Sequence, residues 1–305
     1  MSEKLRSALR ELLLERAQPA SEWSYSTRSR QTATEPTALA ILATGVRPTA
    51  LTRMQHQDGS WTPVHLYGSP CWPTSWTTSL ALITLLHTEP GSAAIAKAVH
   101  WLCSSRGMES HWLWRWKFKT VDTQVSFDPD KFGWNWAPDT ASWVIPTAFA
   151  ILALRLAEKQ ISGTKASRTR IQLGIEMLLD RACPGGGWNA GNGVAFGVAL
   201  APHVEATAIA LLALQGTPAS RSQLAADSLG WLIDQTGQCR GITSAAWAIL
   251  AIHAYHRDGE LAGKRHDHLA RLLEAPRQVT DNSALAVSAL ALDTVDGRNV
   301  FGVVE

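Results

Sequence analysis

Apolar residues follow two different patterns that alternate along the chain. In the first, an alanine-rich run is apolar on nearly every side, and it recurs from Pro36, Thr77, Pro146, Glu205, Ser244 and Asn282. In the second, apolar residues recur every three or four positions with charges between them, at 3–17, 94–105, 170–182, 224–235 and 266–275. The first pattern is typical of helices buried on all sides, and the second of helices buried on one face.

The alanine-rich run occurs six times at a spacing of roughly forty residues, which indicates a helical repeat. Its alternation with one-sided helices predicts two concentric layers, an inner ring covered by an outer ring. We therefore predict an all-α fold, an (α/α)6 toroid or barrel of six helical hairpins, formed by a single domain over 1–305. Closure of the ring would remove the exposed ends of an open solenoid.

Two intervals between the copies are longer than the others and contain insertions, at 107–138 and 183–202. In the first, Trp112, Trp114, Trp116 and Phe118 occupy alternate positions. A period of two residues is typical of a strand, so we predict a short rim β-hairpin around 111–136. The second insertion is rich in glycine, which lets the backbone approach whatever occupies the mouth of the barrel.

Tryptophan is the unusual feature of the composition, with 14 residues against 3 tyrosines and 6 phenylalanines. Rings of this size fill cores or form apolar cavity walls. The net charge is only +2, which does not favour nucleic acid as a partner. The basic and aromatic run from Arg115 to Lys119 is explained by a rim element that packs its rings and exposes its charges.

The cysteines and the N-terminal segment indicate a cytoplasmic location. The four cysteines are far apart and form no CxxC pair, and the first residues are charged and amphipathic, unlike a signal peptide. No apolar run approaches the eighteen residues or so that a membrane span requires. We expect at most peripheral contact with a membrane.

The turn Gln55-x3-Gly59-x-Trp61 resembles the QW motif of squalene-hopene cyclases and related terpenoid cyclases. The six-copy layout resembles the α/α-toroid that these enzymes share with protein prenyltransferase β subunits. The segments GWNWAPDTASWVIPTAFAILALR, LLDRACPGGGWNAGN and VEATAIALLALQ are similar to single-domain bacterial prenyltransferase/squalene oxidase repeat proteins. The resemblance covers nearly the entire chain. It implies that Gln55 pairs with backbone and that Trp61 fastens neighbouring hairpins outside the cavity.

Class II terpenoid cyclases protonate an alkene with an Asp-x-Asp-Asp motif that leads into an inner helix. The matching stretch here, His203 to Ala208, keeps one acid, Glu205, which His203 could orient. This departure counts against polyene cyclisation. The zinc set of the prenyltransferases, Asp-x-Cys with a distant His, is not found at any of the six helix starts. His253 and His256 are only loose candidates for a metal site, so we expect neither a metal nor a cofactor.

Three acids occupy one equivalent position at the starts of the alanine-rich runs: Glu35, Glu205 and Asp281. The helix macrodipole favours a carboxylate there, which is sufficient structural reason for them. They could also surround one mouth of the cavity and bind a cation or exchange protons. Asp139 lies among tryptophans, where exclusion of water would raise its pKa, although a helix cap or turn also explains it.

These observations favour a toroid that binds an apolar polyprenyl or terpenoid molecule in a central cavity lined by Trp76, Trp136, Trp143 and Trp247. Glu205 is the first candidate for the donor in an acid-catalysed cyclisation or isomerisation, and Asp139 is the second. A non-catalytic toroid that binds a lipid or a peptide is the main alternative, so whether the chain is an enzyme stays open. A carbohydrate-active barrel, with sugars stacked on tryptophan, is a third possibility.

Overall fold

The structure is a computed structural model that describes residues 2–64, 71–122, 124, 126–161, 163–255 and 259–303. Within these residues the chain is mostly helical, with one small antiparallel hairpin. Each alanine-rich run forms one helix: α2 (Thr34–Thr44), α4 (Ser75–Thr88), α7 (Val144–Gln160), α9 (Val204–Leu214), α11 (Ile242–Tyr255) and α13 (Asn282–Asp293). The segments between them form α1 (Ser2–Glu15), α3 (Thr49–Arg53), α5 (Ala93–Ser104), α8 (Lys165–Asp180), α10 (Gln223–Thr236) and α12 (Gly259–Leu272).

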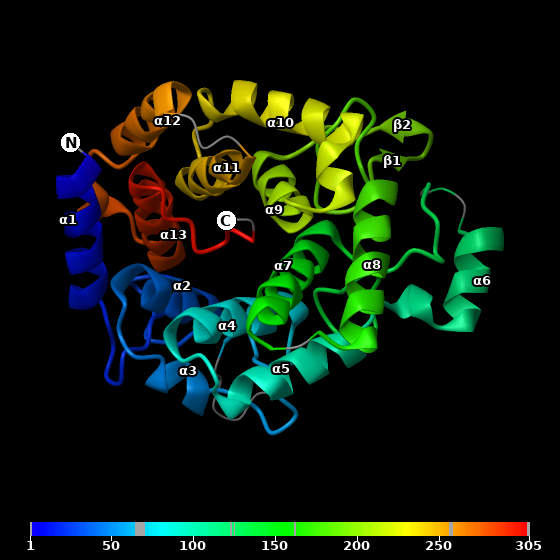
Figure 1. Cartoon of the computed structure of the whole chain (residues 1–305), viewed down its shortest axis with the longest axis horizontal. Helices are drawn as coiled ribbons and strands as arrows, with labels where there is room; N and C mark the ends of the chain where they lie inside the picture. Colours follow the sequence, from blue (N-terminus) through cyan, green and yellow to red (C-terminus); the bar gives the residue numbers. More distant parts are fainter. Residues whose placement is uncertain are drawn as a thin grey trace.

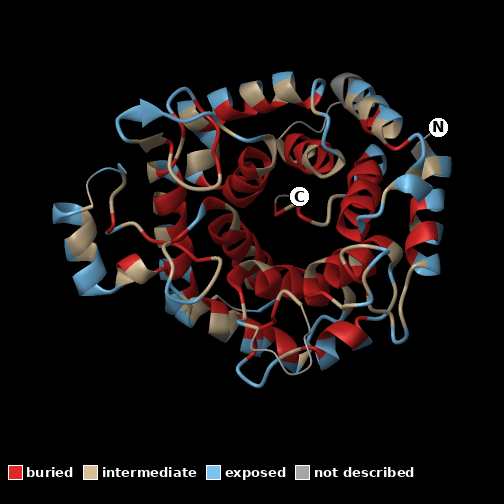
Figure 2. Cartoon of the chain, turned by 180° about the vertical axis from the view of Figure 1, so that it is seen from behind, coloured by how far each residue is buried: buried red, intermediate tan, exposed pale blue. Residues whose placement is uncertain are grey.

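The six alanine-rich helices lie around the middle of the molecule (Figure 1). Each packs against the next in chain order, from α2 through α4, α7, α9 and α11 to α13, and α13 packs against α2. The remaining helices lie outside them: α1 packs on α13 and α2, α8 on α7, and α10 on α9 and α11. Figure 2 shows buried residues dominating the inner helices, while the outer helices turn exposed residues to solvent.

The composition of the inner helices explains their place. In α9, every residue from Ala206 to Leu214 is buried, because both the neighbouring inner helices and the outer helix α10 cover it. Alanine at many of these positions leaves room for close helix contacts, and the leucines and isoleucines fill the space between them. The prediction that the alanine-rich runs are buried on every side is confirmed.

A tryptophan fastens each of the first four outer helices to the inner helix that follows. The indole Nε1 of Trp188 donates to the carbonyl of Leu178 in α8 at 2.6 Å, and its backbone N–H donates to Thr207 Oγ1 in α9 at 2.9 Å. The same arrangement recurs at Trp23 with Leu13 and Thr37, at Trp61 with Leu51 and Thr78, and at Trp134 with Leu102 and Thr147. All four tryptophans are fully buried. They are structural residues that close each helical hairpin.

The turn that contains Trp61 has the hydrogen bonds that the QW resemblance implies. The Gln55 side-chain amide donates to the carbonyls of Gly59 and of Ala94 in α5, at 3.1 and 2.9 Å. Gly59 has a φ of +96°, and a Cβ on it would lie 2.4 Å from the carbonyl oxygen of Lys97. The turn therefore holds α3, α4 and α5 together, away from the centre of the ring of helices.

The predicted β-hairpin at 111–136 is wrong. Residues Trp112–Thr120 form the helix α6, which lies to the side of the main body (Figure 1) and has no buried residue. The His111 side chain accepts from Leu113 N and caps the helix, and Phe118 stacks one turn from Trp114 with ring centroids 6.2 Å apart. Alternation failed as a signal because, among the residues that the structure describes, no second strand pairs with this segment, so local helical contacts determine its structure.

The hairpin of this fold lies instead in the glycine-rich insertion. Strands β1 (Val194–Ala195) and β2 (Val198–Ala199) pair through a two-residue turn at Phe196 and Gly197, whose φ angles are 53° and 72°. Two successive residues with positive φ match the twist of a tight hairpin. The Phe196 N–H donates to the carbonyl of Gln124, which ties the hairpin to the segment after α6.

Candidate functional site

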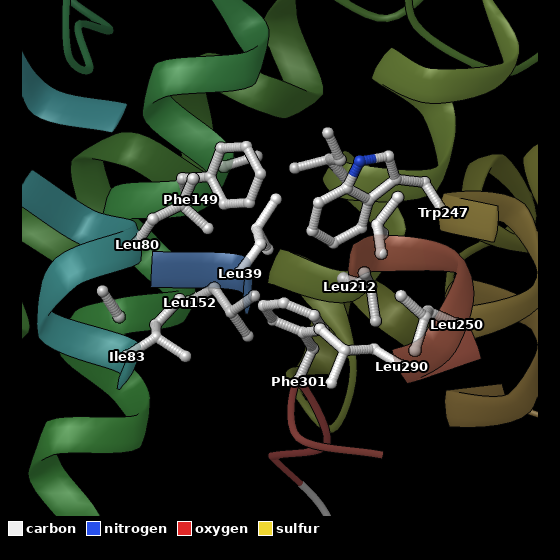
Figure 3. Close-up of a cluster of buried hydrophobic side chains, with 14 of the residues drawn as sticks. Leu39, Leu80, Ile83, Phe149, Leu152, Leu212, Trp247, Leu250, Leu290 and Phe301 are labelled. Carbon is white, nitrogen blue, oxygen red and sulfur yellow. The ribbon is translucent and has the colours of Figure 1, made fainter. Parts of the chain in front are cut away.

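Buried side chains from several inner helices meet near the centre of the ring in the described part of the chain. Trp247, predicted to line a cavity, is buried and packs between Phe149 and Phe301, with ring centroids 5.4 and 4.9 Å away (Figure 3). Leucines and isoleucines from the other inner helices surround these rings. The expected cavity wall at Trp247 is therefore part of a packed hydrophobic core.

Phe301 reaches the centre because the C-terminal segment turns inward and is held there by hydrogen bonds. The Gln215 side-chain amide donates to the carbonyl of Phe301 at 2.8 Å, and its oxygen accepts from the N–H of Val303 at 2.9 Å. The Asn299 amide donates to the carbonyl of Leu250 in α11, and His87 Nε2 lies 2.7 Å from the carbonyl of Val300. These contacts hold the C-terminal segment against the C-terminal ends of α4, α9 and α11.

The three predicted acids lie at the N-terminal ends of the inner helices. Glu35 and Glu205 are the second residues of α2 and α9, and Asp281 is the N-cap of α13. Asp281 Oδ1 accepts from the N–H groups of Ser283 and Ala284, at 2.8 and 3.2 Å, so it has the capping role that helix starts favour. Burial raises the pKa of both glutamates, and the negative charge of Asp281 raises it further.

Glu35 has the most perturbed chemistry of the three. The pKa of its carboxyl is raised to about 7. Burial is the main cause; the hydrogen bond from Tyr25 lowers the pKa, whereas the charges of Asp281 and Glu205 raise it. The Tyr25 hydroxyl donates to Glu35 Oε2 at 2.8 Å, and burial together with the Glu35 charge raises the pKa of Tyr25. At neutral pH a carboxyl of this kind exists in both protonation states, so it can donate or accept a proton.

Tyr25 reaches this position through contacts with α13. Its carbonyl accepts from the N–H of Asn282 at 2.9 Å, and the neighbouring Ser26 forms a β-bridge with Asp281. The Asn282 side chain also donates to the carbonyl of Ser24. The segment before α2 thus crosses between α2 and α13, and it places the phenol against Glu35.

Glu205 and His203 do not form the pair that the sequence suggested. Glu205 is partly buried, and its pKa is raised by burial and then by Asp281. His203 is exposed, at the N-cap position of α9, where its backbone N–H donates to the carbonyl of Trp188 at 2.8 Å. No hydrogen bond between the two side chains is recorded in the described residues. His203 instead lines a cavity of about 430 Å³ with Trp143 and the glycine-rich insertion.

Asp139 lies in an exposed turn, not in an enclosed site. Its φ is 60°, in the left-handed region, and the adjacent Thr140 hydroxyl closes the turn by donating to the carbonyl of Ala137 at 2.7 Å. Its neighbour Trp134 points into the structure as one of the four buried tryptophans. The turn interpretation of this segment is confirmed, whereas a role of Asp139 as proton donor stays a prediction.

The tryptophans predicted to line one cavity lie in different parts of the structure. Trp76, at the start of α4, and Trp136, in the first insertion, meet edge to face with centroids 5.5 Å apart, and both are partly buried. Trp143 is 37% exposed at the N-cap of α7. The Trp76 and Trp136 pair belongs to the same end of the inner helices as the acids, because Trp76 occupies the position in α4 equivalent to Glu35 in α2.

Sequence reasoning missed Tyr25, Gln215 and Phe301. The first hydrogen-bonds to the most perturbed acid, and the other two close the opposite end of the ring. None of them lies in an alanine-rich run, so the repeat gave no signal for them.

The described residues contain no cluster of three or more side chains suited to hold a metal ion. His256, one of the loose candidates, lies outside the described residues. No helix in the described part of the chain is long and apolar enough to cross a bilayer. Comparison of the sequence with known protein families and with curated proteins gives no match.

Proposed function

We propose that the chain is an (α/α)6 toroid of the terpenoid-cyclase type that binds a compact apolar molecule, of isoprenoid character, where its inner helices begin. Glu35 exchanges a proton with this molecule. The closed series of inner-helix neighbours and the four tryptophan links support the toroid. The Trp76 and Trp136 pair supplies an apolar, π-rich surface that suits a carbocation or an alkene.

The observation that carries this proposal is the Glu35 carboxyl with its pKa of about 7, hydrogen-bonded to Tyr25. A proton donor works best when its pKa lies near the operating pH, and burial is the usual way to raise a glutamate to that range. Glu35 thereby replaces Glu205 as the first candidate donor. Glu205 and Asp281 act on it through their charges.

The filled centre limits the size of the molecule. Trp247 and Phe301 pack against each other near the centre of the inner helices, with ring centroids 4.9 Å apart. Proton transfer to a small isoprenoid, with a shift of a double bond or a single ring closure, fits the remaining site better than polyene cyclisation. The reaction class is therefore an isomerisation, and it requires neither a metal nor a cofactor.

Co-purification tests the proposal directly. The protein is purified from its own host, and small molecules extracted into organic solvent are identified by mass spectrometry. We expect an isoprenoid with the wild type, and the unreacted isomer to accumulate with Glu35→Gln. Glu274→Gln, which makes the same change at an exposed glutamate after α12, serves as the control and should behave as the wild type. Absence of any isoprenoid from both wild type and Glu35→Gln would contradict the proposal.

The packed centre also favours a second candidate, a non-catalytic toroid that binds a lipid or peptide at the same end. In that case Glu35 would serve only to shape the site. The same molecule, in the same form and amount, would then be recovered with wild type and with Glu35→Gln. The two candidates are thus separated by the chemical form of the bound molecule.

A further inference from the structure

The helix α6, to the side of the main body (Figure 1), turns an apolar face to solvent. Trp112, Leu113 and Trp116 are 71, 47 and 56% exposed. Trp116 is four residues from Trp112 and three from Leu113, so the three side chains lie on one face of the helix, which we call the tryptophan face. The expectation that the rings of this segment pack is therefore wrong for Trp112 and Trp116. An exposed apolar patch of this kind is typical of an interaction site.

Contacts on the other side of α6 fix this orientation. Phe118, on the side opposite the tryptophan face, meets Phe127 edge to face with ring centroids 5.2 Å apart. The Lys119 ammonium donates to the Asp130 carboxylate at 2.5 Å, and the Arg115 guanidinium lies 3.5 Å from the same carboxylate. These contacts hold one side of the helix against the segment that follows it, so the tryptophan face points away from that segment.

Basic side chains border the tryptophan face on both edges. Arg115 and Lys119, one helical turn apart, border one edge, and Lys117 borders the other. Lys117 pairs with Asp122 at 3.3 Å, as the other two pair with Asp130. All five side chains are a third to a half exposed, and exposed ion pairs are weak, so the cations can also contact other anions. Tryptophan and leucine between two basic edges are typical of a helix that lies in the plane of a membrane surface.

A second copy of the chain fits the tryptophan face less well than a bilayer does. A stable protein interface buries about 800 Å² on each partner, and an aromatic side chain buries about 150–250 Å² in total. Two partly exposed tryptophans and one leucine therefore offer too little area for a stable dimer. The basic edges of one copy would also face those of the other. A bilayer surface adapts to a small apolar element, and its anionic headgroups complement the basic edges.

We propose that α6 binds the surface of a lipid bilayer that contains anionic headgroups. The tryptophan face enters the boundary between headgroups and acyl chains, and the basic edges contact the lipid phosphates. The helix lies in the plane of this boundary, which brings one side of the molecule onto the membrane. This surface is separate from Glu35, and the proposal does not rest on the function proposed above.

Co-sedimentation with vesicles of phosphatidylcholine and about one third phosphatidylglycerol tests the proposal. We expect the wild type to bind these vesicles, and the double variant Trp112→Ala with Trp116→Ala to bind about a hundred-fold more weakly. Burial of a large apolar side chain contributes about ten-fold or more for each ring. The double variant keeps every charge of the chain, so binding through net charge alone would be equal in both proteins. Equal binding, or a wild type that stays in the supernatant, would overturn the proposal.

Trp72→Ala is the matched control, because Trp72 is 63% exposed but lies in the segment before α4. Its binding to the vesicles should equal that of the wild type, and a loss as large as that of Trp112→Ala alone would remove the assignment to α6. No residue of α6 is buried, so the double variant should keep nearly the same unfolding temperature as the wild type. Circular dichroism and thermal unfolding of each variant check this.

Two measurements on the wild type need no variant. Vesicles of phosphatidylcholine alone should bind the protein several-fold more weakly than the mixed vesicles, and added salt should reduce this difference. Equal binding to both compositions would overturn the role of the basic edges and with it the proposal. Sedimentation velocity without lipid should show a monomer. A dimer that is lost on changing Trp112 and Trp116 to alanine would assign the tryptophan face to a second copy of the chain and overturn the proposal.

Discussion

The backbone N–H of Trp188 donates to Thr207 Oγ1 at 2.9 Å, and the Thr207 hydroxyl donates back to the carbonyl of Trp188 at 3.1 Å. Both residues are fully buried. This reciprocal pair, repeated at Trp23 with Thr37 and at Trp134 with Thr147, ties the segment after an outer helix to the first turns of the next inner helix.

Thr207→Val keeps the shape of the side chain and removes both hydrogen bonds. We expect a loss of about 1–3 kcal/mol in the free energy of unfolding, because the buried N–H of Trp188 is left without an acceptor. Urea denaturation followed by circular dichroism measures it. Ser283→Ala is the control at the equivalent position of α13, where the buried hydroxyl has no hydrogen-bond partner in the described residues. That variant should be as stable as the wild type or more so, and equal losses in both would contradict this role of the threonine.

Gly59→Ala tests the turn that holds Gln55 and Trp61. The new Cβ would meet the carbonyl oxygen of Lys97 at 2.4 Å, in addition to the strain of a φ of +96°. Gly91→Ala is the matched control, since Gly91 has a φ of +87° but no neighbour within 4 Å of the added Cβ. We expect Gly59→Ala to lower the thermal unfolding temperature clearly more than Gly91→Ala. Equal shifts in the unfolding temperature would mean that the close approach of Gly59 to Lys97 in α5 does not affect stability.

Phe301→Ala tests whether the C-terminal segment is part of the core. The side chain is fully buried against Trp247, so its removal should cost about 3–5 kcal/mol in the free energy of unfolding. Phe196→Ala, at a ring that is 72% exposed in the β1–β2 turn, should change the stability by less than about 0.5 kcal/mol. Chemical denaturation of both variants measures the difference. A small loss with Phe301→Ala would show that the ring does not pack in the centre in solution.

The repeat made most of the fold predictable from the sequence. Alanine-rich runs are buried on every side because only such helices tolerate neighbours all round, so the six inner helices could be found from composition alone. The short helix α3 and the helix α6 were missed, since five and nine residues leave little periodicity. The alternation from Trp112 to Phe118 indicated a strand, but a strand requires a partner, and no local pattern reveals whether one is present.

The candidate site was only partly predictable. The sequence placed Glu35, Glu205 and Asp281 at equivalent helix starts, and the structure has them at the second positions of α2 and α9 and at the N-cap of α13. Which acid has the most strongly raised pKa depends on the path of the segment before α2, because this segment places Tyr25 against Glu35. No spacing in the sequence predicts that path. The packing of Phe301 against Trp247 could not be predicted either, because the segment after α13 has to turn inward to bring the two rings together.

The pH dependence of stability follows from the raised pKa of Glu35. Because its pKa rises from 4.5 to about 7 on folding, the folded state binds more protons than the unfolded state between these values. Stability from this group is therefore greatest below about pH 4.5 and falls as the pH rises through 7, by about 3 kcal/mol in total. Glu35→Gln should remove most of this fall, whereas Asp139→Asn, which changes an exposed carboxyl, should leave it. Denaturation curves from pH 4.5 to 8 that are parallel for wild type and Glu35→Gln would contradict the assignment.

The most direct measurement is the titration of the Glu35 carboxyl itself, followed by carbon NMR of the labelled protein and assigned by comparison with Glu35→Gln. A midpoint near pH 7 would show that burial beside Tyr25 and two further acids keeps a proton on this carboxyl close to neutrality, as proton exchange with a bound molecule requires. A midpoint near 4.5, the value of an exposed glutamate, would contradict the account.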